Sequence, residues 1–532
     1  MAPDVSWPEL DAVFRVFTKP GSPGCSVAMA VRDSVIYRRG YGLAVIEWGI
    51  PNDPATVFEL GSVSKQFTAF SILLLEQEGK LSLGDDIRKW LPELPRYGKP
   101  ITINHLIHHT SGLRDYDPLL VYRGTRYHDV ATNADILDMM ARQIGLNFPA
   151  GSQWQYSNTN YVLLAMIVER VTGQSFRAFA RTRIFEPLGM KSSRIRDDHT
   201  EIIPRQAKGY QRPSETTVSV DVSDWEETGD GSVQSSADDL LKWMDNLRTG
   251  KVGGADLVRK MMETGRLDDG TPVTYAFGLQ IDTWRGLKRV QHGGSWAGYR
   301  SHVARFPEAE LAVVTTCNDA TADPTSLALD AAAVVLKDRL QPVAVVTAHS
   351  GTALGPLAGI YWSEAAAQAL FIRVDGSQLV VNREGGPSGI ALQETGERTF
   401  KLGSDMVVTF SPGAGPAASF AARSGNLPAV RYGRVASPDT SAAVLRRYSG
   451  RFRSAELRNA QWTVAIKDGG LTLQSAASTR SQPLRALVPD VFTSVMFDDP
   501  VVLQFVRSSS GVVTGFRVTG FALKGLAFER ER

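Results

Sequence analysis

The sequence predicts an α/β sandwich with a helical insertion, followed by two small antiparallel β domains. Three observations carry this prediction. Strand patterns come first, helical patterns follow, and strands return before a final helix, which is the order of a sandwich with an insertion. A Pro-, Gly- and Ala-rich connector at 342–356 then ends the helical periodicity. Beyond the connector, short alternating strands separated by Gly and Asp turns continue to the end of the chain.

A hairpin and a buried helix are the first elements expected. A short polar turn separates the apolar run 24–31 from a return strand that starts at Val35, so a hairpin is expected over 24–42. From Val63 onward, apolar residues share one face at helical spacing, and Gly79 ends this helix. Apolar neighbours widen the face, so the helix is expected to be buried on most sides.

The helical insertion and the returning strands follow. Helices are expected over 160–172 and 237–249, and each is ended by a glycine. The other elements expected before the connector are strands at 273–281, 287–291, 299–306 and 311–316 and a helix at 326–340.

The tail contains a weak internal repeat. The segment LAGIYWSEAAAQALFIRVDGSQLVV resembles the later segment YSGRFRSAELRNAQWTVAIKDGGLTL. Gly359 aligns with Gly450, and both segments carry an Asp-Gly turn at a corresponding place. Two copies of one small β fold, a barrel or a sandwich, are therefore expected. The domains are predicted at 1–342, 343–440 and 441–532.

The composition indicates a globular protein without a strongly charged partner. The 532 residues are 43% hydrophobic and 21% charged, with a formal net charge of +2. So long a chain exceeds one hydrophobic core, and the near-zero charge gives no argument for binding nucleic acid or an anionic membrane. The N-terminus lacks the regions of a secretory signal, and no apolar run is long enough for a membrane span. A cytoplasmic protein is expected, or a periplasmic one if a leader has been removed.

The two cysteines, Cys25 and Cys317, each lie in an apolar, strand-like run. They could bridge only if folding brings them together, and two buried free thiols are the favoured interpretation. The sequence has no Cys/His cluster with ligand spacing, so neither a metal nor another cofactor is expected.

Ser62-Val63-Ser64-Lys65 is an S-x-x-K motif at the start of the first predicted helix. Residues three apart share a helix face, so the Lys65 amine can reach the Ser62 hydroxyl and take its proton. The helix N-terminus adds partial positive charge near a reacting carbonyl. Taken alone, the pattern is better explained by a helix-capping serine followed by a solvated lysine.

A second motif, Tyr156-Ser157-Asn158, precedes the predicted helix at 160–172. A phenol beside an ammonium is expected to have a lowered pKa, so Tyr156 could act as a general base. The Asn158 amide could bind a substrate amide through its donor and acceptor groups. The alternative is a loop tyrosine followed by a helix-capping Ser or Asn.

A third motif, His292-Gly293-Gly294-Ser295, lies between two strand-like runs. The paired glycines would let the backbone pass close to a substrate, and the Ser295 N–H could join that of Ser62 in an oxyanion hole. The alternative is a tight turn with a surface histidine. Each motif is ambiguous alone, but the three in this order predict a serine hydrolase.

Six segments agree with one superfamily in order and spacing: FELGSVSKQFTAF, ITINHLIHHTSGLRDY, WQYSNTNYVLLAMIVERVTG, IFEPLGM, GDGSVQSSADDLLKW and HGGSWAGY. They resemble the serine β-lactamases and penicillin-binding proteins, in the branch related to class C β-lactamases. The whole chain, with its two β domains, is similar to the bacterial D-aminopeptidases. The resemblance implies a β-lactamase-like α/β sandwich followed by two lipocalin-like β-barrels.

The resemblance also implies roles for the motif residues. Ser62 would be the nucleophile, and Lys65 and Tyr156 would transfer protons. Asn158 and His292 would position these groups and the substrate. Gly294 and Ser295 would belong to the substrate-binding strand. Where β-lactamases carry K-T-G, this chain carries His-Gly-Gly, which removes a fixed positive charge and weakens the case for substrates with a free carboxylate, such as β-lactams.

The tail departs from the D-aminopeptidases at one loop. In those enzymes, a loop of the last β domain reaches the active site and helps to hold the substrate's amino group. The corresponding stretch here, 475–482, contains no acid and one arginine, Arg480, which would not attract an ammonium. One hypothesis is that this loop forms part of the site wall and limits substrate length, with Arg480 facing the substrate. The alternative is a solvated turn.

The function expected is hydrolysis of small amides or short peptides through an acyl-enzyme on Ser62, as in a D-aminopeptidase. A carboxylesterase is the alternative, followed by a D-Ala-D-Ala carboxypeptidase or β-lactamase and by a binding protein on a relict hydrolase fold. The expected partner is a small-molecule or short-peptide substrate, with no nucleic acid and no membrane span. The sequence leaves a homodimer open.

Overall fold

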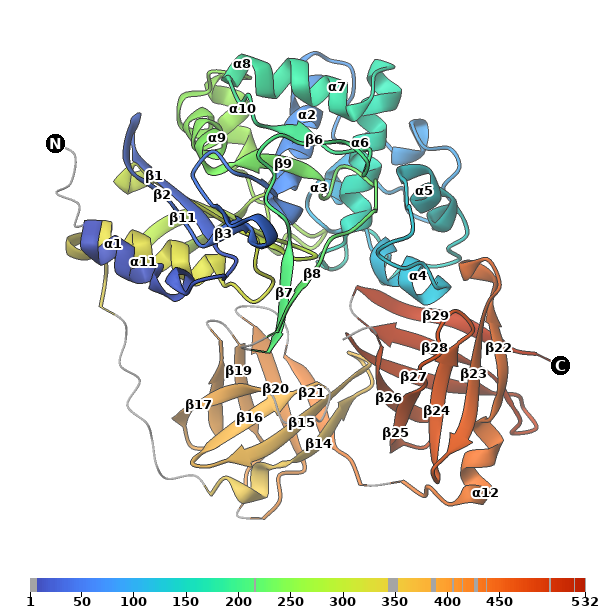
Figure 1. Ribbon diagram of the computed structural model, residues 1–532. Helices are drawn as coiled ribbons and strands as arrows, with labels where there is room; N and C mark the ends of the chain where they lie inside the picture. The colour runs from blue at the N-terminus through green and yellow to red at the C-terminus, as the bar shows by residue number, and fades with distance from the viewer. Residues whose placement is uncertain are drawn as a thin grey trace. The chain divides into compact units, whose positions relative to one another are not determined.

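A computed structural model gives the structure of the protein (Figure 1). By its internal contacts the chain divides into two units, Met1–Asp117 with Thr125–Pro342, and Pro118–Gly124 with Val343–Arg532. The structure describes residues 7–214, 217–342, 353–383, 389–403, 406–413, 415–424, 429–436, 438–496, 499–520 and 522–531. Most of the predicted connector, residues 343–352, therefore lies outside the described residues.

A six-stranded antiparallel sheet forms the centre of the first unit. Its order, β10-β11-β12-β13-β1-β2, places the first strand of the chain beside β13, so early and late segments meet inside one sheet. The predicted hairpin and the predicted strands at 299–306 and 311–316 are confirmed. The strands are β1 (Cys25–Val31), β2 (Ser34–Tyr41), β10 (Gln280–Trp284), β11 (Leu287–Trp296), β12 (Tyr299–Phe306) and β13 (Leu311–Cys317).

The prediction of two free thiols is wrong, because Cys25 and Cys317 form a disulfide. The two residues lie directly opposite each other in the β1–β13 ladder. They are separated by 292 residues in the sequence, so the pairing depends on a strand order that the sequence pattern does not reveal. Both side chains are fully buried.

Helices cover both faces of this sheet (Figure 1). α1 (Trp7–Val13) and α11 (Pro324–Leu336) share an apolar cluster with one face, and α9 (Ala237–Thr249) contacts β1 and β13 from the other. The predicted helices at 237–249 and 326–340 correspond to α9 and α11. The remaining helices before the connector are α2 (Lys65–Gln77), α3 (Ile103–Ile107), α4 (Tyr116–Arg123), α5 (Asn133–Ala141), α6 (Asn158–Thr172), α7 (Phe176–Ala180), α8 (Glu186–Leu188) and α10 (Gly254–Met261).

The helices α2 and α6 pack against each other in the interior of the first unit. α2 is buried along most of its length, as its wide apolar face predicts. By contrast, the strand predicted at 273–281 is mostly wrong. Only its last two residues belong to β10. The residues before them turn sharply at Gly278, whose backbone passes against Lys65 at the start of α2.

Three small sheets complete the first unit, formed by β3-β4, β5-β9-β6 and β7-β8. β5 leads directly into the turn that carries Ser62. Their strands are β3 (Leu43–Val45), β4 (Ile50–Pro51), β5 (Val57–Glu59), β6 (Arg194–Ile195), β7 (Tyr210–Ser214), β8 (Thr217–Val220) and β9 (Val233–Ser236).

Two closed antiparallel barrels make up most of the second unit, and each connects its strands in sequence order. The first barrel consists of β14 (Gly359–Ser363), β15 (Gln368–Asp375), β16 (Gln378–Asn382), β17 (Ile390–Gly396), β18 (Thr399–Leu402), β19 (Met406–Phe410), β20 (Ser419–Ser424) and β21 (Val430–Arg434). After α12 (Ala442–Leu445), the second consists of β22 (Gly450–Ser454), β23 (Ala460–Lys467), β24 (Gly470–Ser475), β25 (Gln482–Val488), β26 (Val491–Met496), β27 (Asp499–Arg507), β28 (Val513–Gly520) and β29 (Leu523–Arg530).

The internal repeat corresponds to the two barrels. Gly359 opens β14 and Gly450 opens β22, so the aligned glycines begin equivalent first strands. Stacked and edge-on aromatic rings fill each interior, such as Phe420 on Tyr432 and Phe516 on Phe528. The predicted fold class, a sandwich with a helical insertion followed by two β-barrels, is confirmed. The residue boundaries of three domains stay a prediction.

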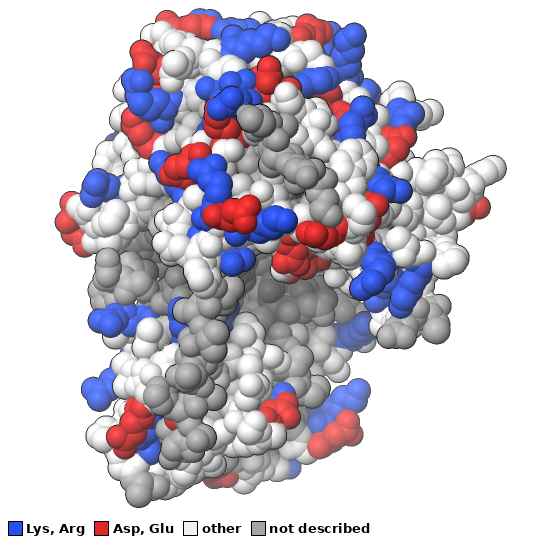
Figure 2. Space-filling model, turned by 90° about the vertical axis from the view of Figure 1, so that its left-hand side faces the viewer, with Lys and Arg blue, Asp and Glu red and all other residues white. Residues whose placement is uncertain are grey.

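The surface carries charges of both signs. Figure 2 shows one face of the molecule, on which Lys and Arg side chains alternate with Asp and Glu. This agrees with the formal net charge of +2. Within the described ranges, none of the helices combines the length and the apolar character needed to cross a bilayer.

Candidate active site

Ser62 and Lys65 face each other at the start of α2. Ser62 lies in a short 3-10 turn, Gly61–Ser64, that passes directly into the helix. Lys65 Nζ lies 3.0 Å from Ser62 Oγ, 2.8 Å from Asn158 Oδ1 and 2.9 Å from the Asp230 carbonyl oxygen. If Lys65 is neutral, its two hydrogens serve Asn158 and Asp230, and its lone pair faces Ser62 Oγ. The geometry therefore suits removal of the Ser62 proton by Lys65.

Lys65 is completely buried, and this sets its acidity. Burial lowers the pKa of the ammonium, while the buried carboxylates of Asp230, Asp115 and Glu227 raise it, and the result is a pKa of about 8. A lysine with this pKa is neutral for an appreciable fraction of the time near neutral pH. That is the state in which it can accept a proton.

The expectation that the ammonium lowers the pKa of Tyr156 is wrong. Burial raises the pKa of Tyr156 well above its ordinary value, and the neighbouring Ser62 hydroxyl offsets only part of the rise. Lys65 Nζ lies over the Tyr156 ring, 5.0 Å from its centroid, rather than at the hydroxyl. The buried hydroxyl has no hydrogen-bond partner among the described residues. Tyr156 is therefore a neutral phenol with a proton to donate.

The loop that carries Tyr156 is fixed from behind by two buried groups. His109 Nδ1 accepts hydrogen bonds from the Ser157 N–H (3.2 Å) and the Asn160 amide (3.1 Å). Asp115 Oδ2 accepts from the Asn158 N–H at 2.6 Å, where α6 begins. A carboxylate at a helix N-terminus is stabilising, and here it also orients the Asn158 side chain toward Lys65.

His292 is neutral and contacts a residue that the sequence did not single out. Burial lowers the pKa of His292 to about 4, although the hydrogen bond to the Gly293 carbonyl acts to raise that pKa. Its Nδ1 donates to that carbonyl at 2.6 Å, so its Nε2 accepts from the Tyr275 hydroxyl at 2.9 Å. His292 makes no hydrogen bond to Lys65 or Tyr156, contrary to the role implied for it. Its ring lies 6.3 Å from that of Tyr156, between centroids.

Gly294 and Ser295 bring β11 against the turn before Ser62. A Cβ on Gly294 would lie 1.9 Å from the Leu60 carbonyl oxygen, so glycine is required by this packing rather than by room for a substrate. A Cβ on Gly61 would lie 2.8 Å from the Ser295 nitrogen. The Ser295 N–H therefore lies close to the start of the Ser62 turn, as a shared oxyanion hole requires.

Three buried residues of this site were missed although they lie in segments that carry the resemblance. Besides Asp115, they are Tyr116, which donates to Asp230 Oδ2 at 3.0 Å, and Asp230, whose carbonyl binds Lys65. The sequence segments that carry the resemblance could have identified them, because Asp115 and Tyr116 end the segment SGLRDY and Asp230 lies in GDGSVQSS. Nothing in the sequence pointed to Tyr275, which lies in the segment predicted as a strand.

An open pocket of about 580 Å³ lies over these residues. Its lining residues come from the Ser62 turn, the Tyr156 loop, β10 to β12 and the start of α11. They are Ser62, Tyr156, Gln280, Gln291, His292, Gly293, Gly294, Ser295, Arg300, Ser301, Ala322, Asp323, Pro324 and Thr325.

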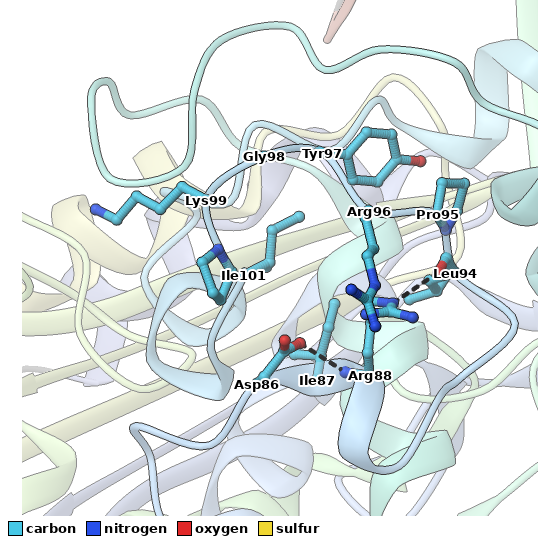
Figure 3. Close-up of a pocket in the computed structure, with 11 residues that line it drawn as sticks. Asp86, Ile87, Arg88, Leu94, Pro95, Arg96, Tyr97, Gly98, Lys99 and Ile101 are labelled. Carbon is cyan, nitrogen blue, oxygen red and sulfur yellow. Dashed lines mark hydrogen bonds between the residues drawn. The ribbon is translucent and has the colours of Figure 1, made fainter.

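A second hollow, of about 270 Å³, is formed by residues 86–88 and 94–101 (Figure 3). None of the predicted site residues lines it. Among the described residues, Asp198, His199 and Glu226 approach one another as metal ligands would, but His199 Nδ1 is already bonded to Glu226 at 2.7 Å. None of these three residues lines the pocket over Ser62.

Arg480 lies in the second unit, in the turn that joins β24 to β25, and its side chain is exposed. Ser478 anchors this turn, since its carbonyl accepts from Gln474 and its hydroxyl accepts from the Arg480 N–H. The role of Arg480 toward a substrate stays a prediction.

The chain belongs to the beta-lactamase family, which matches residues 10–337. This confirms the resemblance and the predicted class of enzyme, a serine hydrolase. The chain is 34% identical to a penicillin-binding protein of Bacillus subtilis over 58% of this chain and 71% of that protein.

Two further similarities extend over the tail. The chain is 27% identical to a D-aminopeptidase of Cereibacter sphaeroides over 98% of both chains. In fold, it is similar to an octameric penicillin-binding protein homologue from Pyrococcus abyssi, with a TM-score of 0.59, 23% identity and coverage of 88% of this chain and 97% of that one.

Proposed function

We propose that the protein hydrolyses small amides and short peptides through an acyl-enzyme on Ser62. The observation that carries this proposal is the buried Lys65 amine, which faces Ser62 Oγ and has a pKa of about 8. A serine hydroxyl becomes a nucleophile when a base of matched pKa lies within hydrogen-bond distance.

In the first half of the reaction, Ser62 Oγ attacks the substrate carbonyl carbon and its proton passes to Lys65 Nζ. The N–H groups of Ser62 and Ser295 stabilise the oxyanion. Tyr156 gives its proton to the leaving nitrogen as the C–N bond breaks, and the Lys65 ammonium returns a proton to Tyr156. Water then attacks the acyl-enzyme, with Lys65 and Tyr156 acting in the reverse sense.

The amide preference rests on similarity and on Asn158. The D-aminopeptidase relative matches the chain over nearly its whole length, including the tail. Asn158 uses its amide oxygen on Lys65, so its amide nitrogen is oriented to donate to a substrate carbonyl. An ester needs less help from a proton donor than an amide does, because an alkoxide leaves more readily than an amide anion.

The Tyr156→Phe variant tests the assignment of Tyr156 as proton donor. Its turnover of an alanine anilide is expected to fall by about a hundredfold, as general-acid losses do. Because a p-nitrophenolate leaves without a proton, release of p-nitrophenol from an ester should fall much less. Parallel steady-state kinetics on both substrates measure the difference. Equal losses on both would argue that Tyr156 only supports the structure of the site.

The pH dependence of kcat/KM tests Lys65 as the base. The rate should rise with pH and level off above a pKa of about 8, because only neutral Lys65 accepts the proton. Asp230 favours the charged form of Lys65, so Asp230→Asn should move this pKa downward by about one unit. The variant preserves an acceptor for the Tyr116 hydroxyl. An unchanged pKa in this variant would show that another group controls the profile.

The substrate class is tested by turnover of D-alanine p-nitroanilide, L-alanine p-nitroanilide and p-nitrophenyl butyrate. Faster turnover of the D-anilide is the result expected of a D-aminopeptidase-like enzyme. Turnover of the ester alone would make the protein a carboxylesterase. No turnover of any of the three would favour a binding protein on a relict fold.

The disulfide bears on the compartment. Disulfides persist in oxidising compartments and are rare in the cytoplasm, so Cys25–Cys317 supports an exported protein over the cytoplasmic one expected from the N-terminus. Three domains at 1–342, 343–440 and 441–532 and a small-molecule or short-peptide substrate complete the proposal, which leaves a homodimer open.

A further inference from the structure

The pocket over Ser62 has two charged groups that lie near different positions of β11, Ser295 and Gly293. Of its lining residues, Arg300 and Asp323 are the charged ones, because burial keeps His292 neutral. Arg300 pairs across the ladder with Ser295, the oxyanion end of the strand. Its Nη1 donates to the carbonyls of Ala297 and Tyr299 at 2.7 Å each.

Asp323 lies near Gly293, which is two residues before Ser295 on β11. A Cβ on Gly293 would lie 3.9 Å from Thr325 Oγ1. His302, which pairs with Gly293 across the ladder, shares a 3.1 Å hydrogen bond with the same Thr325 hydroxyl. Asp323 Oδ1 accepts from the Thr325 N–H at 3.1 Å, so its carboxylate is held next to this contact. Glycine at position 293 therefore places no side chain between β11 and Thr325.

The carboxylate of Asp323 is fixed and ionised. It caps α11 by accepting from the N–H groups of Thr325 and Ser326, and its Oδ2 accepts from the Ser326 hydroxyl at 2.6 Å. Burial acts to raise its pKa, but these hydrogen bonds outweigh burial, and the pKa is lowered. A carboxylate accepts about four hydrogen bonds, so an accepting position remains on the exposed side.

The chemistry of the site decides which part of a substrate meets Asp323. In the proposed reaction the leaving group takes its proton from Tyr156. The buried Tyr156 hydroxyl has no hydrogen-bond partner within the described part of the chain, and the Tyr156 ring lies beside that of His292. In the proposed reaction the oxyanion lies by Ser295, two residues further along β11. A leaving group that extends over His292 and Gly293 would then meet Asp323, and the acyl group would extend the other way.

We propose that Asp323 forms a leaving-group subsite that favours an ammonium and disfavours a carboxylate. This inference rests on the proposed function and adds the charge of the leaving group to it. Amino-acid amides with cationic leaving groups are preferred, neutral ones are accepted, and free dipeptides, whose leaving group carries a carboxylate, are poor substrates. The same repulsion acts on any substrate that places an acid at this end of the pocket.

The test compares Asp323→Asn with the wild-type protein on three matched amides. They share a D-alanyl group and differ in the end of the leaving group: D-alanyl-1,3-diaminopropane, D-alanine butylamide and D-alanyl-β-alanine. Asparagine caps helices as well as aspartate does, so the variant removes the charge and keeps the α11 cap. An exposed ion pair contributes up to about 1 kcal/mol, so each charged substrate should change about threefold relative to the butylamide, in opposite directions. The ammonium-to-carboxylate ratio of kcat/KM should therefore fall about tenfold.

Two controls are needed. One separates the effect of the Asp323 charge from the effect of helix capping, and the other separates contacts to the leaving group from contacts to the acyl group. The first control is Asp86→Asn. Asp86 is another capping aspartate, which accepts a hydrogen bond from the Arg88 N–H, and it does not line the pocket over Ser62 (Figure 3). This variant should leave all ratios unchanged. The ratio of D-alanine butylamide to its N-acetyl derivative should also be unchanged in Asp323→Asn. If this ratio falls instead, Asp323 contacts the acyl end and the assignment to the leaving group is overturned.

An ester pair keeps the test independent of amide cleavage. Butyrylcholine carries a quaternary ammonium on its leaving group, and 3,3-dimethylbutyl butyrate is its neutral isostere. If the wild-type protein cleaves esters but not amides, the proposed function fails, yet Asp323→Asn should still lower the choline-to-neutral ratio about threefold. Ratios that stay within experimental error in both series would overturn the subsite while leaving the proposed function intact. Asp323→Ser, a second capping substitution, should repeat the result of Asp323→Asn.

Discussion

The Ser62→Ala variant is expected to lose at least about 10⁴-fold in kcat/KM on every substrate, because no other group can form the covalent bond to the acyl carbon. Ser62 is partly exposed and its hydroxyl is bonded to Lys65. Removal of this hydroxyl leaves the packing of α2 intact, so the thermal unfolding midpoint should be close to that of the wild-type protein.

The matched control is Ser64→Ala, in the same turn. The Ser64 hydroxyl is buried and accepts a hydrogen bond from the Val233 N–H at 3.1 Å. Its loss leaves a buried donor unsatisfied, which costs about 1–3 kcal/mol of stability but removes no reacting group. The control should thus unfold at a lower temperature and still turn over substrate. If Ser64→Ala were inactive and Ser62→Ala active, the nucleophile would have been misassigned.

The Lys65→Met variant has the second largest expected effect, a loss of about 10³- to 10⁴-fold in kcat/KM. Methionine fills a similar volume without an amine, so Ser62 loses its base and Tyr156 loses the group that returns its proton. Activity should not recover at high pH. A variant that regained activity above pH 9 would indicate that hydroxide or another residue can replace Lys65.

The Lys65 variant also removes a buried charge from among buried carboxylates. Without the ammonium, Asp230 and Asp115 lose a partner that lowers their pKa values, so both should bind protons more readily. Lys242→Met, which removes a half-exposed lysine paired with Asp239, serves as the comparison and should keep activity. Circular dichroism of both variants separates a catalytic loss from a loss of fold.

Much of the fold followed from local patterns. α9 was predicted at its observed bounds, and the repeated segments at Gly359 and Gly450 do open the two barrels. Such elements depend on periodicity and end signals within a few residues. The 273–279 stretch failed because its apolar residues pack in a turn around the buried Tyr275 rather than alternating between two faces of a sheet.

The residues of the candidate site could largely be predicted from the sequence, but their pKa values and some of their contacts could not. Ser62, Lys65 and Asn158, from the first two motifs, come together in the structure. The pKa of Tyr156 is raised rather than lowered, because burial of its hydroxyl outweighs the effect of the neighbouring Ser62, and the extent of burial cannot be read from sequence spacing. The Cys25–Cys317 bond and the place of Asp323 beside Gly293 both depend on strand order and on how α11 meets β11, which are properties of the whole sheet.

The acyl-enzyme on Ser62 is tested most directly by intact mass spectrometry after treatment with a fluorophosphonate, followed by peptide mapping. One adduct is predicted, on Ser62, at a rate that follows the same pKa of about 8 as turnover. The adduct should be absent from Ser62→Ala. An adduct on Ser64 or Ser111 in place of Ser62, or continued substrate turnover by protein fully labelled on Ser62, would contradict the assignment of Ser62 as the nucleophile.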